Sequence, residues 1–188
     1  MHIGLFFGSF NPIHNGHLML AQWMVNFGGI DEVWFVVSPQ NPFKVNTSLA
    51  PSESRVEMVK RAIATSDKMR VCDIELSLPI PSYTANTLQA LHEKYPDDIF
   101  SIIMGGDNVA GLPKWYKVEE VLKHQILVYP RPNCDKVEVP NANIEYTNAP
   151  QIDISSTQIR QWVQQQKLIN HFVPQSVADY IAEKALYR

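Results

Sequence analysis

Short apolar runs alternate with amphipathic patterns along the chain, and this alternation limits the possible folds more than any other feature. Strands are predicted near Ile3–Phe7, Val33–Ser38, Arg70–Ile74, Ser101–Met104 and Ile126–Tyr129, with a short one near Asn143–Tyr146. Helices are predicted near Gly16–Phe27, Ser52–Thr65, Thr84–Lys94, Val118–Lys123, Ser156–Gln165 and Gln175–Ala185. Buried strands in repeated strand–helix order predict an α/β fold, a Rossmann-like doubly wound parallel sheet with helices on both faces. With 188 residues, the chain is predicted to form a single domain.

Three local predictions concern helix ends and packing. Asn15 is expected to cap the first helix. Glu57, three residues after Ser54, has the spacing of a capping box. The last helix is expected to pack on the sheet through an apolar face made of Val177, Tyr180, Ile181 and Ala185.

The first chemical motif is His14-Asn15-Gly16-His17, which follows the first strand and a Gly8-Ser9-Phe10-Asn11-Pro12 turn. A helix N-terminus carries unpaired N–H groups and partial positive charge, which suits a phosphate. Two imidazoles separated by a small glycine can both donate hydrogen bonds to phosphoryl oxygens. Taken alone, the pair can equally be a helix cap and an ordinary loop histidine.

The second motif is Asp153-Ile154-Ser155-Ser156-Thr157-Gln158-Ile159-Arg160. Ser155 or Ser156 can cap the following helix, and Arg160 can turn its permanently charged fork back onto phosphate oxygens. Taken alone, this motif is better explained by a plain capped surface helix with a solvated arginine. Two such helix starts in one small chain, however, indicate a clamp for a nucleoside triphosphate.

These two segments resemble the HxGH nucleotidyltransferase superfamily, and over nearly its full length the chain resembles the bacterial nicotinate-mononucleotide adenylyltransferase family. Further matches are Asn41-Pro42-Phe43-Lys44, Arg55 with Met58, Pro81-Ser82-Tyr83-Thr84 with Thr87-Leu88, Gly105-Gly106-Asp107-Asn108, Lys114-Trp115-Tyr116 and Arg131-Pro132. Asn86 stands where members of the family often carry aspartate, and Ser77 stands where a basic residue is common. Both departures concern the substrate loop rather than the reaction.

The resemblance implies a role for each matching residue. His14, His17, Lys44 and Arg160 would be catalytic. ATP would be bound by Gly8, Ser9, Phe10, His14, His17, Gly105, Asp107, Arg131, Ile154, Ser155, Ser156 and Arg160. Nicotinate mononucleotide would be bound by Ser9, Phe10, Lys44, Tyr83, Thr84, Asn86 and Trp115. From the residues alone, Gly105-Gly106-Asp107 could equally be a tight loop, and Trp115 is better explained as a core aromatic anchoring a helix.

The charge balance and the cysteines narrow the class of protein. A formal net charge of −3 argues against a broad surface for nucleic acid or anionic membranes, although Lys44, Arg55, Arg131 and Arg160 can still form a local positive pocket. There is no basic-then-apolar leader and no apolar stretch long enough to span a bilayer. Cys72 and Cys134 lack the paired spacing of a metal or redox site. A cytoplasmic protein with reduced thiols is therefore expected, and a homo-oligomer remains open.

The sequence therefore predicts an enzyme that transfers the adenylyl group of ATP to nicotinate mononucleotide. No cluster of carboxylates suits an all-protein metal cage, so Mg²⁺ is expected to arrive on the triphosphate and no protein metal site is predicted. One alternative is a sister transferase acting on nicotinamide mononucleotide, phosphopantetheine or a sugar phosphate. Another is an inactive nucleotide-binding regulatory module, which would be expected to carry damaged motifs.

Overall fold

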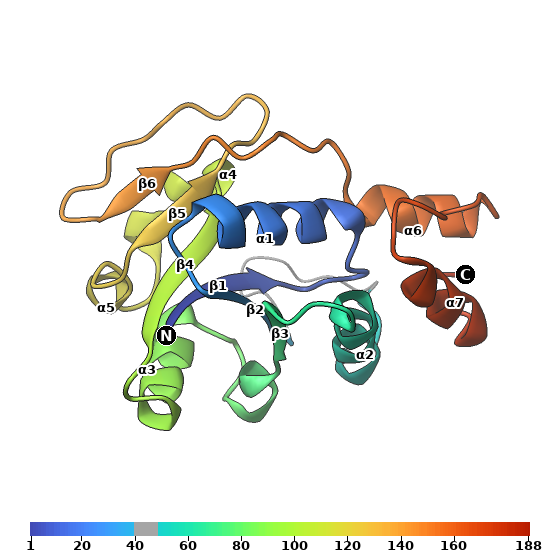
Figure 1. The fold of residues 1–188 in the computed structure, drawn as a ribbon, viewed down its shortest axis with the longest axis horizontal. Coiled ribbons are helices and arrows are strands. Elements are labelled where there is room, and N and C mark those ends of the chain that lie inside the picture. The colour runs from blue at the N-terminus through green and yellow to red at the C-terminus, as the bar shows by residue number, and fades with distance from the viewer. Residues whose placement is uncertain (40–48) are drawn as a thin grey trace.

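A computed structural model describes residues 1–39 and 49–188. Six parallel strands form one sheet in the order β3-β2-β1-β4-β5-β6 (Figure 1). Their bounds are β1 His2–Gly8, β2 Glu32–Val37, β3 Met69–Cys72, β4 Ile99–Gly105, β5 Ile126–Tyr129 and β6 Ile144–Tyr146. The strand order reverses between β1 and β4, so the predicted Rossmann-like doubly wound sheet is confirmed.

All the helices that the sequence predicts are present, although α5 is only one turn of the predicted Val118–Lys123. Their bounds are α1 Asn15–Phe27, α2 Ser52–Ile63, α3 Thr84–Lys94, α5 Val118–Val121, α6 Ser156–Gln164 and α7 Gln175–Glu183. Three short elements were not predicted: α4 Gly106–Val109 and the 3₁₀ helices η1 Ile74–Ser77 and η2 Leu112–Lys114. A single turn is too short to show a hydrophobic period. None of the helices among the described residues is long and apolar enough to cross a membrane.

Successive side chains of the central strand point to opposite faces of the sheet and contribute to a core on each face. In β1, Leu5 belongs to the cluster that includes Leu88 of α3 and Val121 of α5. Phe6 belongs to the other cluster, which includes Met24 of α1 and Met58 of α2. Because each face of the sheet is covered by helices, the expected two-sided packing is also confirmed.

The prediction for the start of the first helix is wrong by one residue. The N-cap is His14, whose extended backbone (φ −143°, ψ 168°) precedes the helix. Asn15 is the first helical residue instead. Its side-chain amide donates to the carbonyl of His171 (2.5 Å), and its N–H donates to the carbonyl of Phe172 (2.9 Å). Asn15 therefore joins the start of α1 to the segment between α6 and α7.

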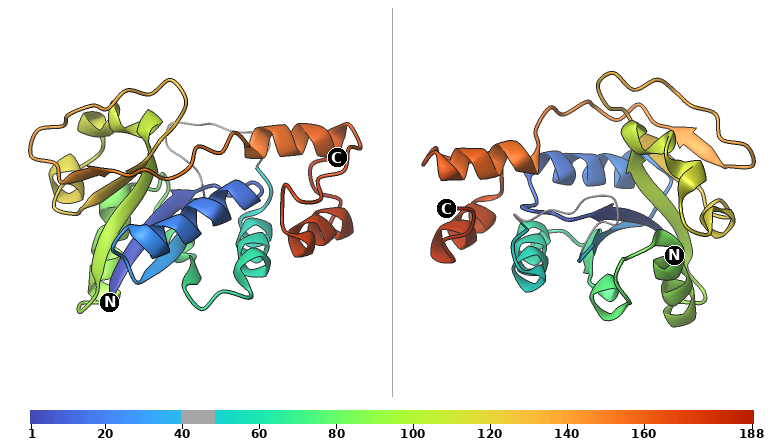
Figure 2. Two further views of the ribbon diagram at one scale, coloured as in Figure 1. Left: turned by 45° about the horizontal axis from the view of Figure 1, so that its top comes forward. Right: turned by 180° about the vertical axis from the view of Figure 1, so that it is seen from behind.

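The predictions for α2 and α7 are also wrong in detail. Helix α2 begins at Ser52, as the predicted range has it, so Ser54 is not its cap; Glu57 lies beyond the first turn and pairs with Arg61 (2.8 Å). Helix α7 packs against α2 rather than directly on the sheet, with the Ser176 hydroxyl donating to the Arg61 carbonyl (3.1 Å). Figures 1 and 2 show α6 and α7 together at the end of the molecule opposite β6. Val177, Tyr180 and Ile181 are buried as expected, but a helix covers them, and Ala185 lies beyond the end of α7 and is exposed.

Candidate functional site

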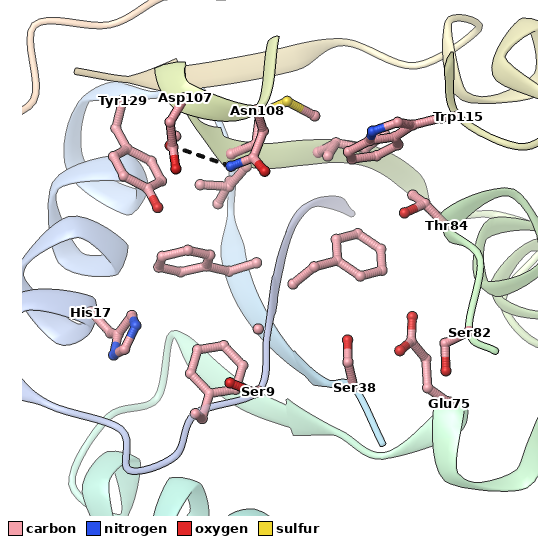
Figure 3. Close-up of a pocket in the computed structure, with 18 of the residues that line it drawn as sticks. Ser9, His17, Ser38, Glu75, Ser82, Thr84, Asp107, Asn108, Trp115 and Tyr129 are labelled. Atoms are coloured by element: carbon pink, nitrogen blue, oxygen red, sulfur yellow. Dashed lines mark hydrogen bonds between the residues drawn. The ribbon is translucent and has the colours of Figure 1, made fainter. Parts of the chain in front are cut away.

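A cavity of about 350 Å³ opens at the carboxyl ends of the central strands, beside the point where the strand order reverses. Gly8 ends β1, Gly105 ends β4 and Tyr129 ends β5, and all three line the cavity. Ligands of open α/β sheets bind at this position. Figure 3 shows His17 and Tyr129 along one side of the cavity, with Trp115 and Thr84 along the opposite side.

The two motif histidines form a stacked pair. Their ring centroids are 3.7 Å apart with an interplanar angle of 24°. Nδ1 of His17 accepts a hydrogen bond from the main-chain N–H of His14 (3.3 Å). Since an accepting nitrogen carries no proton, the neutral His17 ring has its proton on Nε2. His17 lines the cavity, whereas the His14 ring is buried behind it.

Burial keeps both imidazoles neutral near pH 7. It lowers the pKa of His14 from 6.5 to about 4, and the positive charge of Arg131 adds to the effect. The pKa of His17 is lowered well below its usual value, mainly by burial and further by His14 and Arg131. The pair therefore presents a hydrogen-bond donor rather than a charge to the cavity.

The second motif meets the first at the edge of this cavity. Ser155 caps α6 and forms a capping box with Gln158. The Ser156 hydroxyl donates to the carbonyl of Pro12 (2.8 Å), and Nη1 of Arg160 donates to the carbonyl of Asn11 (2.8 Å). The start of α6 is thus fixed to the turn that precedes the histidines.

Gly16 permits this close approach. A Cβ atom at position 16 would lie 2.7 Å from Cγ2 of Ile154 and 3.0 Å from Nδ1 of His14. Both distances are shorter than an unstrained packing contact. The glycine of the first motif is therefore explained by its contact with the second.

A carboxylate and a guanidinium face the cavity from β4 and β5. Asp107 lies in the first turn of α4, directly after β4. Arg131 follows β5, stacks over the ring of Tyr129 (5.1 Å) and lies 3.8 Å from Asp107. In the part of the chain that the structure describes, Nε of Arg131 has no hydrogen-bond acceptor. The guanidinium retains a donor for an incoming anion or hydroxyl.

Aromatic side chains and a helix start lie on the opposite side of the cavity. Trp115 packs against the core cluster on the α3 face and also lines the cavity, so the core and site interpretations both hold in part. Tyr83 is the N-cap of α3 and its ring lies 4.6 Å from that of Tyr116. Thr84 begins α3, where the first N–H groups lack acceptors within the helix.

Arg55 does not contribute a cation to the pocket. The side chain is 1% exposed and donates to the carbonyls of Ala50 (3.1 Å), Ser9 (2.7 Å), Ser38 (2.7 Å) and Pro39 (3.1 Å) and to the Ser52 hydroxyl (3.0 Å). The expectation that it adds to a positive pocket is therefore wrong. Its guanidinium instead fixes the backbone at Ser9 and Ser38, both of which line the cavity.

Most of the predicted site residues surround one cavity. Its lining includes Gly8, Ser9, Phe10, His17, Tyr83, Thr84, Gly105, Asp107, Trp115, Arg131 and Ser156. Five others lie outside this lining, namely His14, Asn86, Ile154, Ser155 and Arg160. Lys44 lies outside the described residues.

Sequence reasoning missed a polar group made of Ser38, Glu75 and Ser82, which line the lower part of the cavity in Figure 3. Glu75 is 2% exposed and accepts from the Thr87 hydroxyl (2.7 Å). Burial raises the pKa of Glu75, and the hydroxyls of Thr87, Ser38 and Ser82 oppose this rise. Glu75 lies between Ile74 and Leu76, where polar and apolar residues alternate, and this pattern carries no signal that the glutamate is buried. Among the described residues, no group of three or more His, Cys, Asp or Glu side chains could hold a metal ion.

The fold and the paired helix starts define a nucleotidyltransferase, and comparison with known proteins supports this class. The cytidylyltransferase-like family model matches residues 5–162. The chain is 46% identical to the probable nicotinate-nucleotide adenylyltransferase of Cytophaga hutchinsonii over 189 residues, covering 100% of this chain and 98% of that protein. It is 37% identical to the nicotinate-nucleotide adenylyltransferase of Bacillus subtilis over 186 residues, covering 98% and 97%.

A solved structure shows the same fold at lower identity. Plasmodium falciparum nicotinic acid mononucleotide adenylyltransferase complexed with NaAD has a TM-score of 0.76 at 22% identity, covering 99% of this chain and 97% of that chain. On the strength of the full-length relatives, the chain belongs to the nicotinate-nucleotide adenylyltransferase family.

Proposed function

We propose that the chain transfers the adenylyl group of ATP to nicotinate mononucleotide, giving nicotinate adenine dinucleotide and pyrophosphate. The observation that carries the proposal is the junction of the two motifs. His17 and Ser156 line the same cavity, and hydrogen bonds from Ser156 and Arg160 hold α6 against the turn before His14. A single polyphosphate can contact both helix starts only if they are fixed together.

The reaction needs positioning more than acid–base chemistry. The 5′-phosphate of the mononucleotide attacks the α-phosphorus of ATP in line, and the bond to the bridging oxygen breaks as pyrophosphate leaves. A phosphate monoester has a second pKa of about 6, so the nucleophile is already largely dianionic at neutral pH. No general base is required, and catalysis comes from orientation and charge stabilisation.

The residues at the histidine side would act on the phosphates. The Nε2–H of His17 would donate to oxygens that gain charge at the α-phosphate, with His14 stacked behind it. The main chain of Gly8, Ser9 and Phe10 would lie along the phosphates. Ser155, Ser156, Arg160 and Arg131, with Ile154 packed below them, would hold the β- and γ-phosphates. Lys44, outside the described residues, remains a predicted catalytic cation.

The opposite side would bind the pyridine ring. Trp115 offers a flat surface for a cationic pyridine, and the N–H groups beside Tyr83 and Thr84 suit its carboxylate. Asn86 is a predicted contact of the same substrate, although it lies outside the cavity lining. Gly105 and Asp107 would receive the adenosine ribose, because a carboxylate accepts from ribose hydroxyls.

Mg²⁺ would enter with ATP. Asp107 stands near Arg131 rather than in a carboxylate cage, so the residues fit a metal held mainly by phosphate oxygens. When bound, the metal would neutralise charge on the triphosphate. Two further expectations remain predictions: that residues 1–188 act as a single domain and that the protein is cytoplasmic. The sequence left a homo-oligomer open, and it stays open.

Pyrophosphate release tests the proposal directly. ATP and Mg²⁺ are supplied with nicotinate mononucleotide, nicotinamide mononucleotide or phosphopantetheine in parallel reactions. We expect the highest kcat/KM with the acid mononucleotide. A preference for another acceptor would identify a sister transferase. Calorimetric binding of ATP without pyrophosphate release from any acceptor would indicate the inactive binding module.

A further inference from the structure

The side chain of Asn11 connects the phosphate turn to the last residues of the chain. Its Oδ1 accepts hydrogen bonds from the hydroxyl of Tyr187 (2.8 Å) and the N–H of Ala50 (3.0 Å). Its main-chain carbonyl accepts from Nη1 of Arg160 (2.8 Å). Three segments that are distant in sequence therefore meet at one residue, which is itself 1% exposed.

We propose that Tyr187 is a positioning residue for the triphosphate site: its hydroxyl holds Asn11, and Asn11 holds the guanidinium of Arg160. The inference rests on the proposed function, because it assumes that Arg160 binds ATP. It adds a residue that neither sequence motif contains.

The geometry explains how a phenol outside the cavity can act on the site. Two donors from different directions fix the Asn11 amide in one orientation, which restrains the adjoining peptide and its carbonyl. Among the described residues, the guanidinium of Arg160 makes one further hydrogen bond, from Nη2 to the Thr157 hydroxyl (3.3 Å), so its position depends on the Asn11 carbonyl. Loss of the phenol would leave this guanidinium less ordered before ATP binds.

The hydroxyl is suited to permanent donation. Burial raises the pKa of Tyr187, and the nearby guanidinium groups of Arg160 and Arg55 only partly oppose the rise. The phenol therefore remains protonated at neutral pH and supplies its O–H to Asn11.

The variant Tyr187→Phe removes only the hydroxyl. We expect the KM for ATP to rise about three- to tenfold, the range for loss of one neutral hydrogen bond. The KM for nicotinate mononucleotide and kcat should change less than about twofold, because the pyridine side and the histidines are untouched. A variant that merely folded poorly would lower kcat through its active fraction and leave both KM values unchanged.

The matched control is Tyr146→Phe. The hydroxyl of Tyr146 accepts from the N–H of Val137 (2.7 Å) and donates to its carbonyl (2.6 Å), and it lies outside the cavity lining. Its loss should leave all three kinetic constants unchanged. An equal rise in the KM for ATP in both variants would overturn the assignment of Tyr187.

A double-mutant cycle with Arg160→Ala identifies the route of action. If Tyr187 acts through Arg160, Tyr187→Phe should change the KM for ATP less than about 1.5-fold in the Arg160→Ala background. Full additivity, or an unchanged KM for ATP in Tyr187→Phe alone, would refute the inference while leaving the proposed reaction intact. The proposed reaction is refuted by separate results: no pyrophosphate release by the unaltered protein with nicotinate mononucleotide, or a higher kcat/KM with another acceptor.

Discussion

Acidification should weaken the fold through His14. The side chain is 5% exposed, and burial together with Arg131 lowers its pKa from 6.5 to about 4. Between these values the unfolded chain binds a proton that the folded protein does not. The contribution of His14 to stability is therefore complete above pH 6.5 and is lost as the pH falls toward about 4. The difference between the two pKa values of His14 corresponds to a loss of about 3 kcal/mol in the free energy of unfolding.

The assay is urea unfolding near pH 7, about pH 5.5 and about pH 4, applied to the unaltered protein and to His14→Asn. Asparagine keeps a favourable N-cap and removes the titrating ring. The stability advantage of the unaltered protein should shrink by about 3 kcal/mol across this range. Loss of His14 also raises the pKa of His17 toward its usual value, so the variant loses less stability in acid. The advantage of the unaltered protein therefore shrinks further. An advantage that stays constant from pH 7 to 4 would show that His14 titrates normally in the folded state.

Three substitutions test other parts of the account. His17→Ala should lower kcat about 10²-fold or more with little change in the KM for ATP, since it removes a preorganised donor; kcat equal to that of the exposed control His92→Ala would contradict this role. Trp115→Ala should raise the KM for nicotinate mononucleotide about tenfold and leave the KM for ATP unchanged. An equal rise in both KM values would rule out specific stacking of Trp115 on the pyridine ring. Arg55→Lys should reduce the free energy of unfolding by about 3 kcal/mol, because an ammonium cannot satisfy the same set of carbonyls; unchanged stability in urea would mean that those acceptors find other partners.

The fold could be predicted because its determinants are local. The continuous apolar run of β1 and the periodic pattern of α3 are both visible in short windows of sequence. The position of the cavity followed from the same pattern, since parallel strands bring their carboxyl ends to one edge. Helix α4 and the two 3₁₀ helices escaped detection because one turn has no repeating period.

Long-range hydrogen bonds to the main chain could not be predicted. Arg55 was identified only as a cation, but its acceptors are mainly backbone carbonyls, which every residue possesses. The contact between Tyr187 and Asn11 joins residues 176 positions apart and leaves no local pattern. The sequence also treated His14 and His17 alike. The structure separates them, because the N-cap position turns His14 inward while the third helical residue faces the cavity.

A crystal structure with a non-hydrolysable ATP analogue tests the central claim most directly. The account predicts one triphosphate with oxygens at about 3 Å from Nε2 of His17 and also from the Ser156 hydroxyl or the Arg160 guanidinium. A triphosphate bound in contact with only one of these two helix starts, or outside the cavity, would contradict it.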